Sequence, residues 1–230
     1  MEKIIVAIGG GEIKTKETLD IDRYIADFIK SRTGERRPYG LFIGTASHDS
    51  MPYFNSFRKT YTSVFDIKAD VALTVYGEMD YDHIAEKFDK ADFIYVGGGD
   101  TKFMIESWRK SGMLDLIIGA YNRGVVLTGL SAGAICWFND VYSDFDIING
   151  KSGEYKFMKG LNILDGLACP HYDNRAEFDK AFLDNDCTFA YAMSNNSALV
   201  FVDEKFNKSI GKNKSYLLTK PNGVLTKEEL

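Results

Sequence analysis

The sequence predicts an α/β fold with a mostly parallel sheet, helices on both faces and antiparallel strands at an edge. Up to Leu130, short apolar runs alternate with segments whose apolar residues recur at helical spacing. This alternation is typical of buried parallel strands joined by amphipathic helices. The chain has 230 residues, of which 45% are hydrophobic, and it contains no repeat or Pro/Ser-rich linker. We therefore expect a single domain over residues 1–230.

The first strand is expected at Ile4–Ile8, where a buried apolar run is ended by three glycines. Further strands of the parallel set are predicted at residues 41–43, 71–75, 93–96 and 125–127. Helices are predicted between them at residues 21–29, 53–61, 81–89 and 102–122, the last as one helix or two. Beyond Asp140 the alternation weakens. Strands at 188–192, 198–202 and 215–219 are expected to extend the sheet, and residues 227–230 are expected to be frayed.

Composition argues against several classes of partner and location. The net charge of −5 disfavours nucleic acid, because phosphate binding requires a basic face. The three cysteines are odd in number and widely spaced, which favours free thiols in a reducing compartment. No apolar run approaches the roughly 20 residues of a membrane span. The sequence thus predicts a cytoplasmic protein that binds neither nucleic acid nor a membrane, as a monomer or homodimer.

A candidate nucleophile is Ser131, because residues 129–133 read Gly-Leu-Ser-Ala-Gly and match the G-x-S-x-G pattern. The segment follows an apolar strand and precedes a helical pattern that continues to Phe138, which is the context the motif requires. Small neighbours let strand and helix pass closely, so that the serine projects above the sheet near helix amides. The alternative is a glycine-rich turn with a serine N-cap.

A serine nucleophile needs a base, and the sequence offers His48, His83 and His171. His83 lies on a predicted helix among charged residues, which favours a surface role. His48 follows a strand end and is able to border the site. His171 is preferred as the base because Pro170 fixes the backbone just before it, although a packed loop histidine is the alternative. No H-E-x-x-H pattern or paired cysteine spacing is present, so no metal is expected.

A carboxylate is expected to orient the histidine, and the sequence alone leaves its identity open. The acids that lie close in sequence to Ser131 or His171 are Asp140, Asp144, Asp146, Asp165 and Asp173.

The oxyanion site is expected to include the amide of Ala132, directly after the nucleophile. Residues 97–101, Gly-Gly-Gly-Asp-Thr, follow another strand, and backbone without Cβ atoms approaches a substrate carbonyl closely. Gly98 and Asp100 are therefore expected to contact substrate. Helix capping by Asp100 or Thr101 is the alternative, and both roles are compatible. Lys14 stands where a dinucleotide-binding loop would need its third glycine, so no cofactor is expected.

Together these segments resemble peptidase family S51, the aspartyl dipeptidase (peptidase E) and cyanophycinase group, and most closely its Gram-positive-type branch. The resemblance rests on five blocks in order, at residues 5–12, 42–47, 95–101, 129–138 and 169–172. It implies a three-layer flavodoxin-like fold related to class I glutamine amidotransferases. It also implies Ser131 as nucleophile, His171 as base and oxyanion donors at Gly99 and Ala132. Members cleave peptides after an N-terminal aspartate, or β-aspartyl links.

Two departures from the family pattern bear on the mechanism. Asn195 stands where the aspartyl dipeptidases have a glutamate that serves as third member of the triad. The resemblance then leaves two candidates for the third member of the triad. Asp144 belongs to a Ser-Asp motif of this branch, and Asp146 has the spacing after the serine that the family shows. The segment after His171 is shorter, but Arg175 still aligns with an arginine that binds the substrate aspartate. An exposed arginine at a helix start is the alternative for Arg175.

The resulting prediction is a serine-type exopeptidase for short peptides, with dipeptides that begin with aspartate as candidate substrates. A binding or regulatory protein with a degraded triad is the alternative, and Asn195 favours it. A thiol enzyme that uses Cys136 is a third hypothesis, opposed by the position of this residue within the predicted helix.

Overall fold

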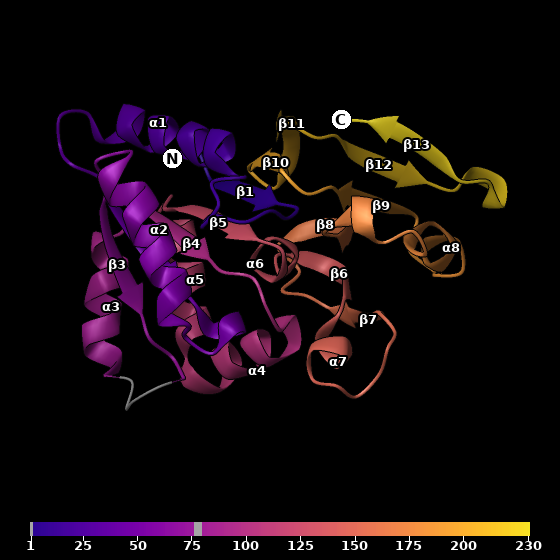
Figure 1. Cartoon of the computed structure of the whole chain (residues 1–230), viewed down its shortest axis with the longest axis horizontal. Coiled ribbons are helices and arrows are strands. Elements are labelled where there is room, and N and C mark those ends of the chain that lie inside the picture. Colours follow the sequence, from indigo (N-terminus) through magenta and orange to yellow (C-terminus); the bar gives the residue numbers. More distant parts are fainter. Residues whose placement is uncertain (1, 76–79) are drawn as a thin grey trace.

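The computed structural model describes residues 2–75 and 80–230, whose strands form a seven-stranded and a six-stranded sheet (Figure 1). The larger sheet has the order β11-β10-β1-β5-β4-β2-β3, in which β1 to β5 run parallel and β10 and β11 are antiparallel. The predicted fold class, a mostly parallel sheet with antiparallel edge strands, is confirmed. The strands are β1 (Ile4–Ile8), β2 (Tyr39–Ile43), β3 (Lys68–Ala72), β4 (Phe93–Val96), β5 (Val126–Leu130), β10 (Ser197–Val202) and β11 (Lys205–Gly211).

Helices cover both faces of this sheet because successive strand residues point to opposite sides. Ile4, Val6 and Ile8 share an apolar cluster with α1 and α2, whereas Ile5 and Ala7 belong to a cluster with α3, α4 and α5. The helices are α1 (Leu19–Thr33), α2 (Met51–Ser63), α3 (Tyr81–Lys90), α4 (Thr101–Ser111), α5 (Met113–Asn122) and α6 (Ala132–Ile135). The result is a three-layer core.

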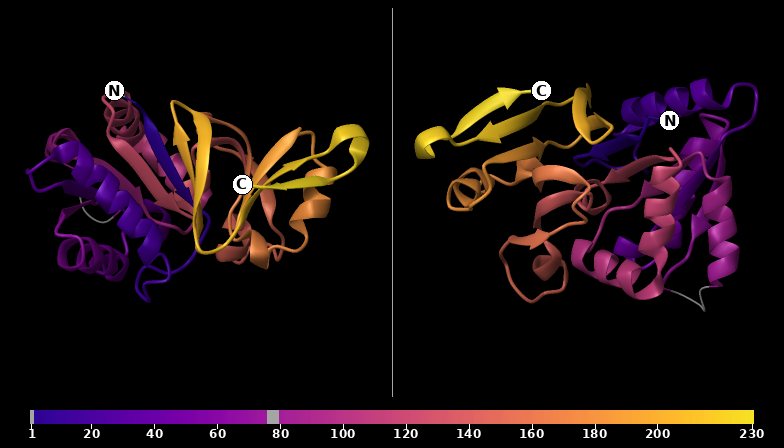
Figure 2. Two further views of the ribbon diagram at one scale, coloured as in Figure 1. Left: turned by 90° about the horizontal axis from the view of Figure 1, so that it is seen from above. Right: turned by 180° about the vertical axis from the view of Figure 1, so that it is seen from behind.

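The smaller sheet has the order β13-β12-β9-β8-β6-β7 and lies beside the larger one (Figure 2). Phe138 and Val141 of this sheet join the same cluster as Ile5 and Leu127 of the larger one, so the sheets share a core. Its elements are β6 (Phe138–Ser143), α7 (Phe145–Ile148), β7 (Lys156–Lys159), β8 (Leu164–Cys169), α8 (Phe178–Leu183), β9 (Phe189–Met193), β12 (Ser215–Thr219) and β13 (Thr226–Glu229).

Four local predictions are wrong. The strand expected at 71–75 lies earlier, as β3 (Lys68–Ala72), because residues 68–72 are the ones that pair with β2. Strands β9 and β12 belong to the smaller sheet rather than extending the larger one. The helix after Ser131 ends at Ile135 instead of continuing to Phe138, because Phe138 begins β6. The C-terminal residues 227–230 are not frayed: β13 pairs with β12, and Glu229 forms an ion pair with Lys214.

The topology brings the predicted loops together. β1, β5 and β4 are neighbours and run parallel, so their carboxyl ends meet at one edge of the sheet. Gly9, Gly97 and Ser131 follow these three ends directly. Within the described residues, none of the helices is both long and apolar enough to cross a membrane.

Candidate active site

Ser131 occupies a strained turn between β5 and α6. Its φ is 54° and its ψ is −111°, a region that non-glycine residues rarely adopt. The turn is crowded: a Cβ atom at Gly129 would lie 2.1 Å from the carbonyl oxygen of Gly133. The backbone therefore requires glycine at this position, as expected for a sharp strand-to-helix turn that presents the serine above the sheet.

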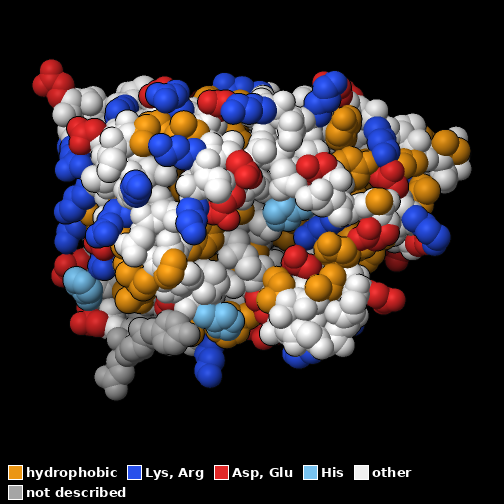
Figure 3. All heavy atoms as spheres, viewed as in Figure 1, with side chains coloured by type: hydrophobic (Ala, Val, Ile, Leu, Met, Phe, Trp, Pro, Cys, Tyr) orange, Lys and Arg blue, Asp and Glu red, His pale blue; other side chains and the backbone are white. Residues whose placement is uncertain are grey.

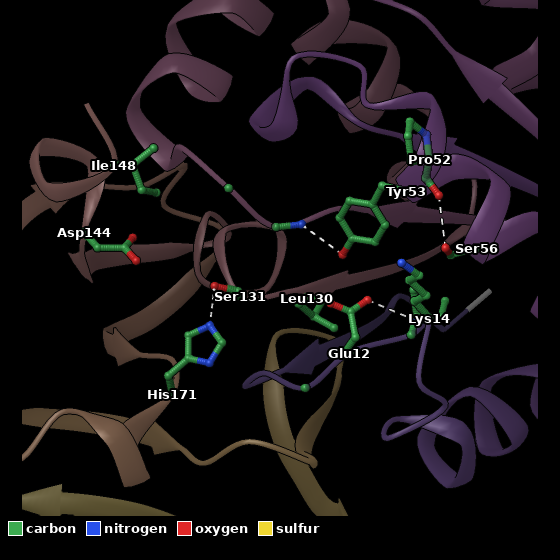
Figure 4. A pocket seen from close by; sticks show the side chains of 14 residues that line it. Glu12, Lys14, Pro52, Tyr53, Ser56, Leu130, Ser131, Asp144, Ile148 and His171 are labelled. Atoms are coloured by element: carbon green, nitrogen blue, oxygen red, sulfur yellow. Dashed lines mark hydrogen bonds between the residues drawn. The ribbon is translucent and has the colours of Figure 1, made fainter. Parts of the chain in front are cut away.

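His171 faces this serine from the loop after β8. Its Nε2 lies 2.9 Å from Ser131 Oγ (Figure 4). The histidine is itself in the left-handed region, with a φ of 50°, and its backbone N–H donates to the carbonyl of Gly9. Burial lowers the pKa of His171 below its ordinary value, so the imidazole is neutral near pH 7 and able to accept a proton.

The other ring nitrogen of His171 meets an amide. His171 Nδ1 lies 2.7 Å from Asn195 Oδ1. The Nδ2 of Asn195 lies 3.1 Å from each carboxylate oxygen of Asp173, and the backbone N–H of Asn195 also donates to Asp173, at 2.8 Å. A carboxylate only accepts hydrogen bonds, so the NH₂ group must face Asp173 and the oxygen must face the histidine.

This orientation fixes the tautomer of the base. Asn195 Oδ1 is an acceptor, so His171 Nδ1 carries the ring proton and Nε2 is left free to accept the proton of Ser131. The resulting order is Ser131, His171, Asn195, Asp173, in which the only charge lies one residue beyond the usual third member of a triad.

The end of β1 holds three parts of this arrangement through its carbonyl groups. Those of Ile8, Gly9 and Gly10 accept hydrogen bonds from the backbone N–H groups of Ser131, His171 and Asn196, respectively. A Cβ atom at Gly10 would lie 2.2 Å from Asn195 Oδ1 and 2.3 Å from His171 Nδ1. The glycine loop after β1 thus leaves the space in which the histidine and the asparagine meet.

Backbone amides are available to a developing oxyanion. Across residues 2–75 and 80–230, no group accepts a hydrogen bond from the amide of Gly99 or of Ala132. Gly99 and Ser131 line the same cavity, and Ala132 is the first residue of α6. The amide of Gly98 is engaged instead, because it donates to the hydroxyl oxygen of Tyr53 at 3.2 Å.

A cavity of about 460 Å³ opens at Ser131, and we call it the Ser131 cavity. Asp144 and Ile148 lie on one side of the serine, and Tyr53, Ser56 and Lys14 lie on the other (Figure 4). The full lining is Gly11, Glu12, Ile13, Lys14, Pro52, Tyr53, Ser56, Gly98, Gly99, Leu130, Ser131, Asp144, Ile148 and His171.

The aspartates proposed from the sequence as orienting groups have other partners. Asp144 lines the Ser131 cavity, but its Oδ2 lies 3.5 Å from the guanidinium of Arg175. Asp146 forms an ion pair with Lys156 at 2.7 Å, which lowers the pKa of this carboxyl. The position beside His171 Nδ1, assigned to one of these acids, is filled by Asn195 because the turn before β10 reaches the site from the other side.

Two residues expected to bind substrate do not line the cavity. Arg175 is 2% exposed, donates to the carbonyl of Tyr142 at 2.6 Å and stacks over the ring of Tyr155. Asp100 is buried and caps α4 by accepting from the amide of Phe103, the alternative role given above. Gly98 does line the cavity. His48, which was able to border the site, packs instead against the ring of Phe103.

Sequence reasoning missed the side of the cavity formed by α2 and the loop before α1, which contributes Tyr53, Ser56, Glu12 and Lys14. It also missed the hydrogen bonds that Asn195 donates to Asp173. The sequence does contain a signal that α2 borders the site. This helix begins directly after the loop that follows β2, at the edge of the sheet where the carboxyl ends of the strands meet.

The surroundings of Cys136 disfavour thiol chemistry. Cys136 is fully buried at the C-terminal end of α6, and burial raises the pKa of its thiol well above the ordinary value. A protonated, enclosed thiol is a poor nucleophile, which disfavours the third hypothesis. Among the described residues, no three His, Cys, Asp or Glu side chains converge as metal ligands would.

Comparison with known proteins gives matches over most of the chain. The model of peptidase family S51 matches residues 5–209. An uncharacterized peptidase of Bacillus subtilis, YgaJ, is 29% identical over 214 residues, which cover 91% of this chain and 87% of that protein. An uncharacterized peptidase of Listeria innocua, Lin0382, is 32% identical over 138 residues, or 58% of this chain and 64% of that protein.

Solved structures share the fold. A peptidase from an acI-B1 Actinobacterium superposes with a TM-score of 0.76 at 18% identity, covering 100% of this chain and 94% of that one. A putative peptidase E protein from Listeria monocytogenes superposes with a TM-score of 0.67 at 19% identity, covering 93% and 100%.

Proposed function

The chain belongs to peptidase family S51, and from that premise we propose that it is a serine-type exopeptidase acting on short peptides by acyl transfer. The observation that carries this proposal is the 2.9 Å contact between Ser131 Oγ and His171 Nε2 on a strained turn. A nucleophile and base within hydrogen-bond reach, with the base oriented by a further group, is the arrangement that activates serine.

In the proposed reaction, His171 Nε2 takes the proton of Ser131 as Oγ attacks the substrate carbonyl. The amides of Gly99 and Ala132 donate to the oxyanion of the tetrahedral intermediate. His171 then gives its proton to the leaving amine, and an acyl-serine remains. Water attacks this ester with His171 again as base, and the products are an acid and the free enzyme.

Asn195 sets the tautomer but carries no charge to stabilise the imidazolium. An amide in this position is harmful when it presents its NH₂ group to the histidine and forces the wrong tautomer. Here Asp173 prevents that flip by holding Nδ2. We infer a working base that is weaker than one paired directly with a carboxylate.

For substrate, we propose short peptides that begin with aspartate, on the resemblance of Arg175 to the aspartate-binding arginine of the family. Arg175 lies behind Asp144, which lines the Ser131 cavity. A substrate carboxylate would therefore have to replace Asp144 at the guanidinium. The separation of 3.5 Å between Asp144 and Arg175 is long for a charge-assisted hydrogen bond, so this exchange loses little.

Unpaired Cys136, Cys169 and Cys187 support a reducing, cytoplasmic location.

The test compares wild type with Ser131→Ala in labelling by a fluorophosphonate probe and in hydrolysis of Asp-X dipeptides. We expect the wild type to be labelled and to hydrolyse the peptides, and the variant to do neither while it keeps the same circular dichroism spectrum. Full activity of Ser131→Ala would refute the proposal.

A binding or regulatory role is the alternative, favoured by the neutral residue at His171 Nδ1. It predicts a folded protein that binds peptides, and whose Ser131 is not labelled under conditions that label a known serine peptidase.

A further inference from the structure

A second hollow lies along α2, next to the Ser131 cavity. This hollow, which we call the lysine hollow, has a volume of about 370 Å³ and shares Lys14 and Ser56 with the Ser131 cavity. Its lining is Lys14, Lys16, Asn55, Ser56, Lys59, Thr60, Ser63 and Val64. The α2 residues at positions 55, 56, 59, 60 and 63 fall on one face because they are spaced three or four apart.

The lysine hollow carries positive charge, and no acidic side chain among the described residues forms an ion pair with its lysines. None of its lining residues is acidic. Lys14, Lys16 and Lys59 are exposed, and their ammonium groups form no ion pair within residues 2–75 and 80–230. Arg37, which lies near this face, pairs with Asp66 instead. An unpaired cluster of this kind in a chain of net charge −5 favours an anionic ligand.

The positive face extends beyond the lysine hollow. A neighbouring hollow shares Asn55, Lys59 and Ser63 with it and adds Arg37, Arg58 and Lys68. Figure 3 shows Lys and Arg side chains gathered over the part of the molecule where α1 and α2 lie. In the Ser131 cavity, the Lys14 side chain points toward Ser56, at the junction with the lysine hollow (Figure 4).

We propose that the lysine hollow binds acidic side chains of the substrate on the leaving-group side of the scissile bond. This inference rests on the proposed function. An exopeptidase that releases an N-terminal residue has only that residue in the acyl part, so a longer substrate extends solely on the leaving-group side. The enzyme thereby selects peptides whose residues after the cleaved bond carry carboxylates. An acidic peptide fits better than a nucleic acid because the lysine hollow is short and shares Lys14 and Ser56 with the cavity that holds the nucleophile.

The experiment compares two peptides, Asp-Ala-Glu-Glu and Asp-Ala-Gln-Gln, which differ in charge but hardly in shape. Each exposed lysine–carboxylate pair stabilises by a fraction of a kcal/mol, so we expect kcat/KM to be about tenfold higher for the Glu peptide. In Lys14→Gln/Lys16→Gln/Lys59→Gln the ratio is expected to fall to about one. The wild-type ratio is also expected to shrink as the salt concentration rises.

A matched control removes three lysines elsewhere. Lys30, Lys110 and Lys205 are exposed and line neither the Ser131 cavity nor the lysine hollow. Lys30→Gln/Lys110→Gln/Lys205→Gln changes the net charge equally and is expected to keep the tenfold ratio. A wild-type ratio near one, or a ratio that survives loss of Lys14, Lys16 and Lys59, would overturn the proposal.

Binding separates this inference from the catalytic proposal. In Ser131→Ala, fluorescein-labelled Glu peptide is expected to bind about tenfold tighter than the labelled Gln peptide, and the added lysine substitutions should remove the difference. This result supports the lysine hollow even if neither peptide is hydrolysed by wild type. Equal binding of the two peptides overturns it. So does a single-stranded oligonucleotide that binds through these lysines more tightly than the Glu peptide, because the ligand would then be nucleic acid.

Discussion

Asn195 Oδ1 lies 2.7 Å from His171 Nδ1, at the position where a serine hydrolase triad usually places a carboxylate. The negative charge lies instead on Asp173, beyond the asparagine. The charge that supports the imidazolium therefore acts through a neutral amide, and exchanging Asn195 and Asp173 tests this relationship.

The loss of kcat/KM at low pH should reflect protonation of His171. Hydrolysis needs the neutral imidazole, and burial lowers its pKa, so activity persists to lower pH than for an exposed histidine. We expect kcat/KM to fall only below about pH 6.5, the ordinary histidine value. Initial rates between pH 4 and 8 check this. His83→Gln, which changes an exposed histidine, should leave the profile unchanged, whereas an acid midpoint above about pH 7 would contradict the assignment.

Exchanging Asn195 and Asp173 should move the charge to the histidine. Asn195→Asp alone sets two carboxylates roughly 3 Å apart, so one of them retains a proton and kcat should fall at least about tenfold. Adding Asp173→Asn relieves this repulsion and restores an NH₂ donor to the new carboxylate. In the double variant we expect kcat to recover and the acid midpoint to rise by about 1–2 pH units.

The measurement for this exchange is the pH dependence of kcat/KM in the two variants and wild type. A single variant Asn195→Asp with wild-type kcat and an unchanged acid midpoint would show that the amide contact has no role in the reaction.

Gly10→Ala should lower activity by on the order of 100-fold without unfolding the protein. The added Cβ would meet both Asn195 Oδ1 and His171 Nδ1 well inside contact distance, so the histidine must move away from Ser131. A displacement of about 1 Å costs on the order of 100-fold in rate. Steady-state kinetics and thermal unfolding check this. Gly119→Ala in α5, where the nearest atom would lie 3.6 Å from the new Cβ, is the control and should keep full activity.

Asp22 should make the protein less stable as the pH rises. This buried carboxyl accepts hydrogen bonds from Thr18 and Tyr61, and burial raises its pKa to about 7. The folded state thus binds the proton more tightly than the unfolded state, whose pKa stays near 3.9. Stability from this group is present below about pH 4 and is lost as the pH rises to about 7.

Asp22→Asn keeps the shape and both hydroxyl partners but does not titrate. Relative to wild type, its free energy of unfolding should increase by roughly 4 kcal/mol between pH 4 and pH 8. Urea unfolding at several pH values measures this difference. Asp27→Asn, at an exposed position of the same helix, should show no such trend. A constant difference for Asp22→Asn across this range would contradict the raised pKa.

The parallel core was predictable because its signals are local. β1, β4 and β5 are apolar runs ended by glycine or by the nucleophile segment, and each is followed by a helical pattern. The smaller sheet gave weaker signals, since β7 is mostly exposed and β13, Thr226–Glu229, is exposed throughout. Such strands are specified by pairing with a neighbour rather than by their own pattern.

The residues of the site also differ in how far local sequence predicts them. Ser131 lies on a turn whose motif is local, and His171 follows Pro170 in a short loop, so both positions were proposed from sequence. The third member depends on which distant segment reaches the imidazole. Spacing favoured Asp144 or Asp146, but Arg175 and Lys156 engage these acids. Contact with Asn195 arises because β10 pairs with β1, an arrangement that no local pattern reveals.

The carbonyls of Ile8, Gly9 and Gly10 also set the moment at which the site forms during synthesis. These residues are synthesised before their partners, which belong to segments at Ser131, His171 and Asn196. Until the turn before β10 has been synthesised, Asn195 is absent and His171 lacks the amide that fixes its tautomer. The arrangement of serine, histidine and asparagine is therefore complete only after most of the 230 residues have been synthesised.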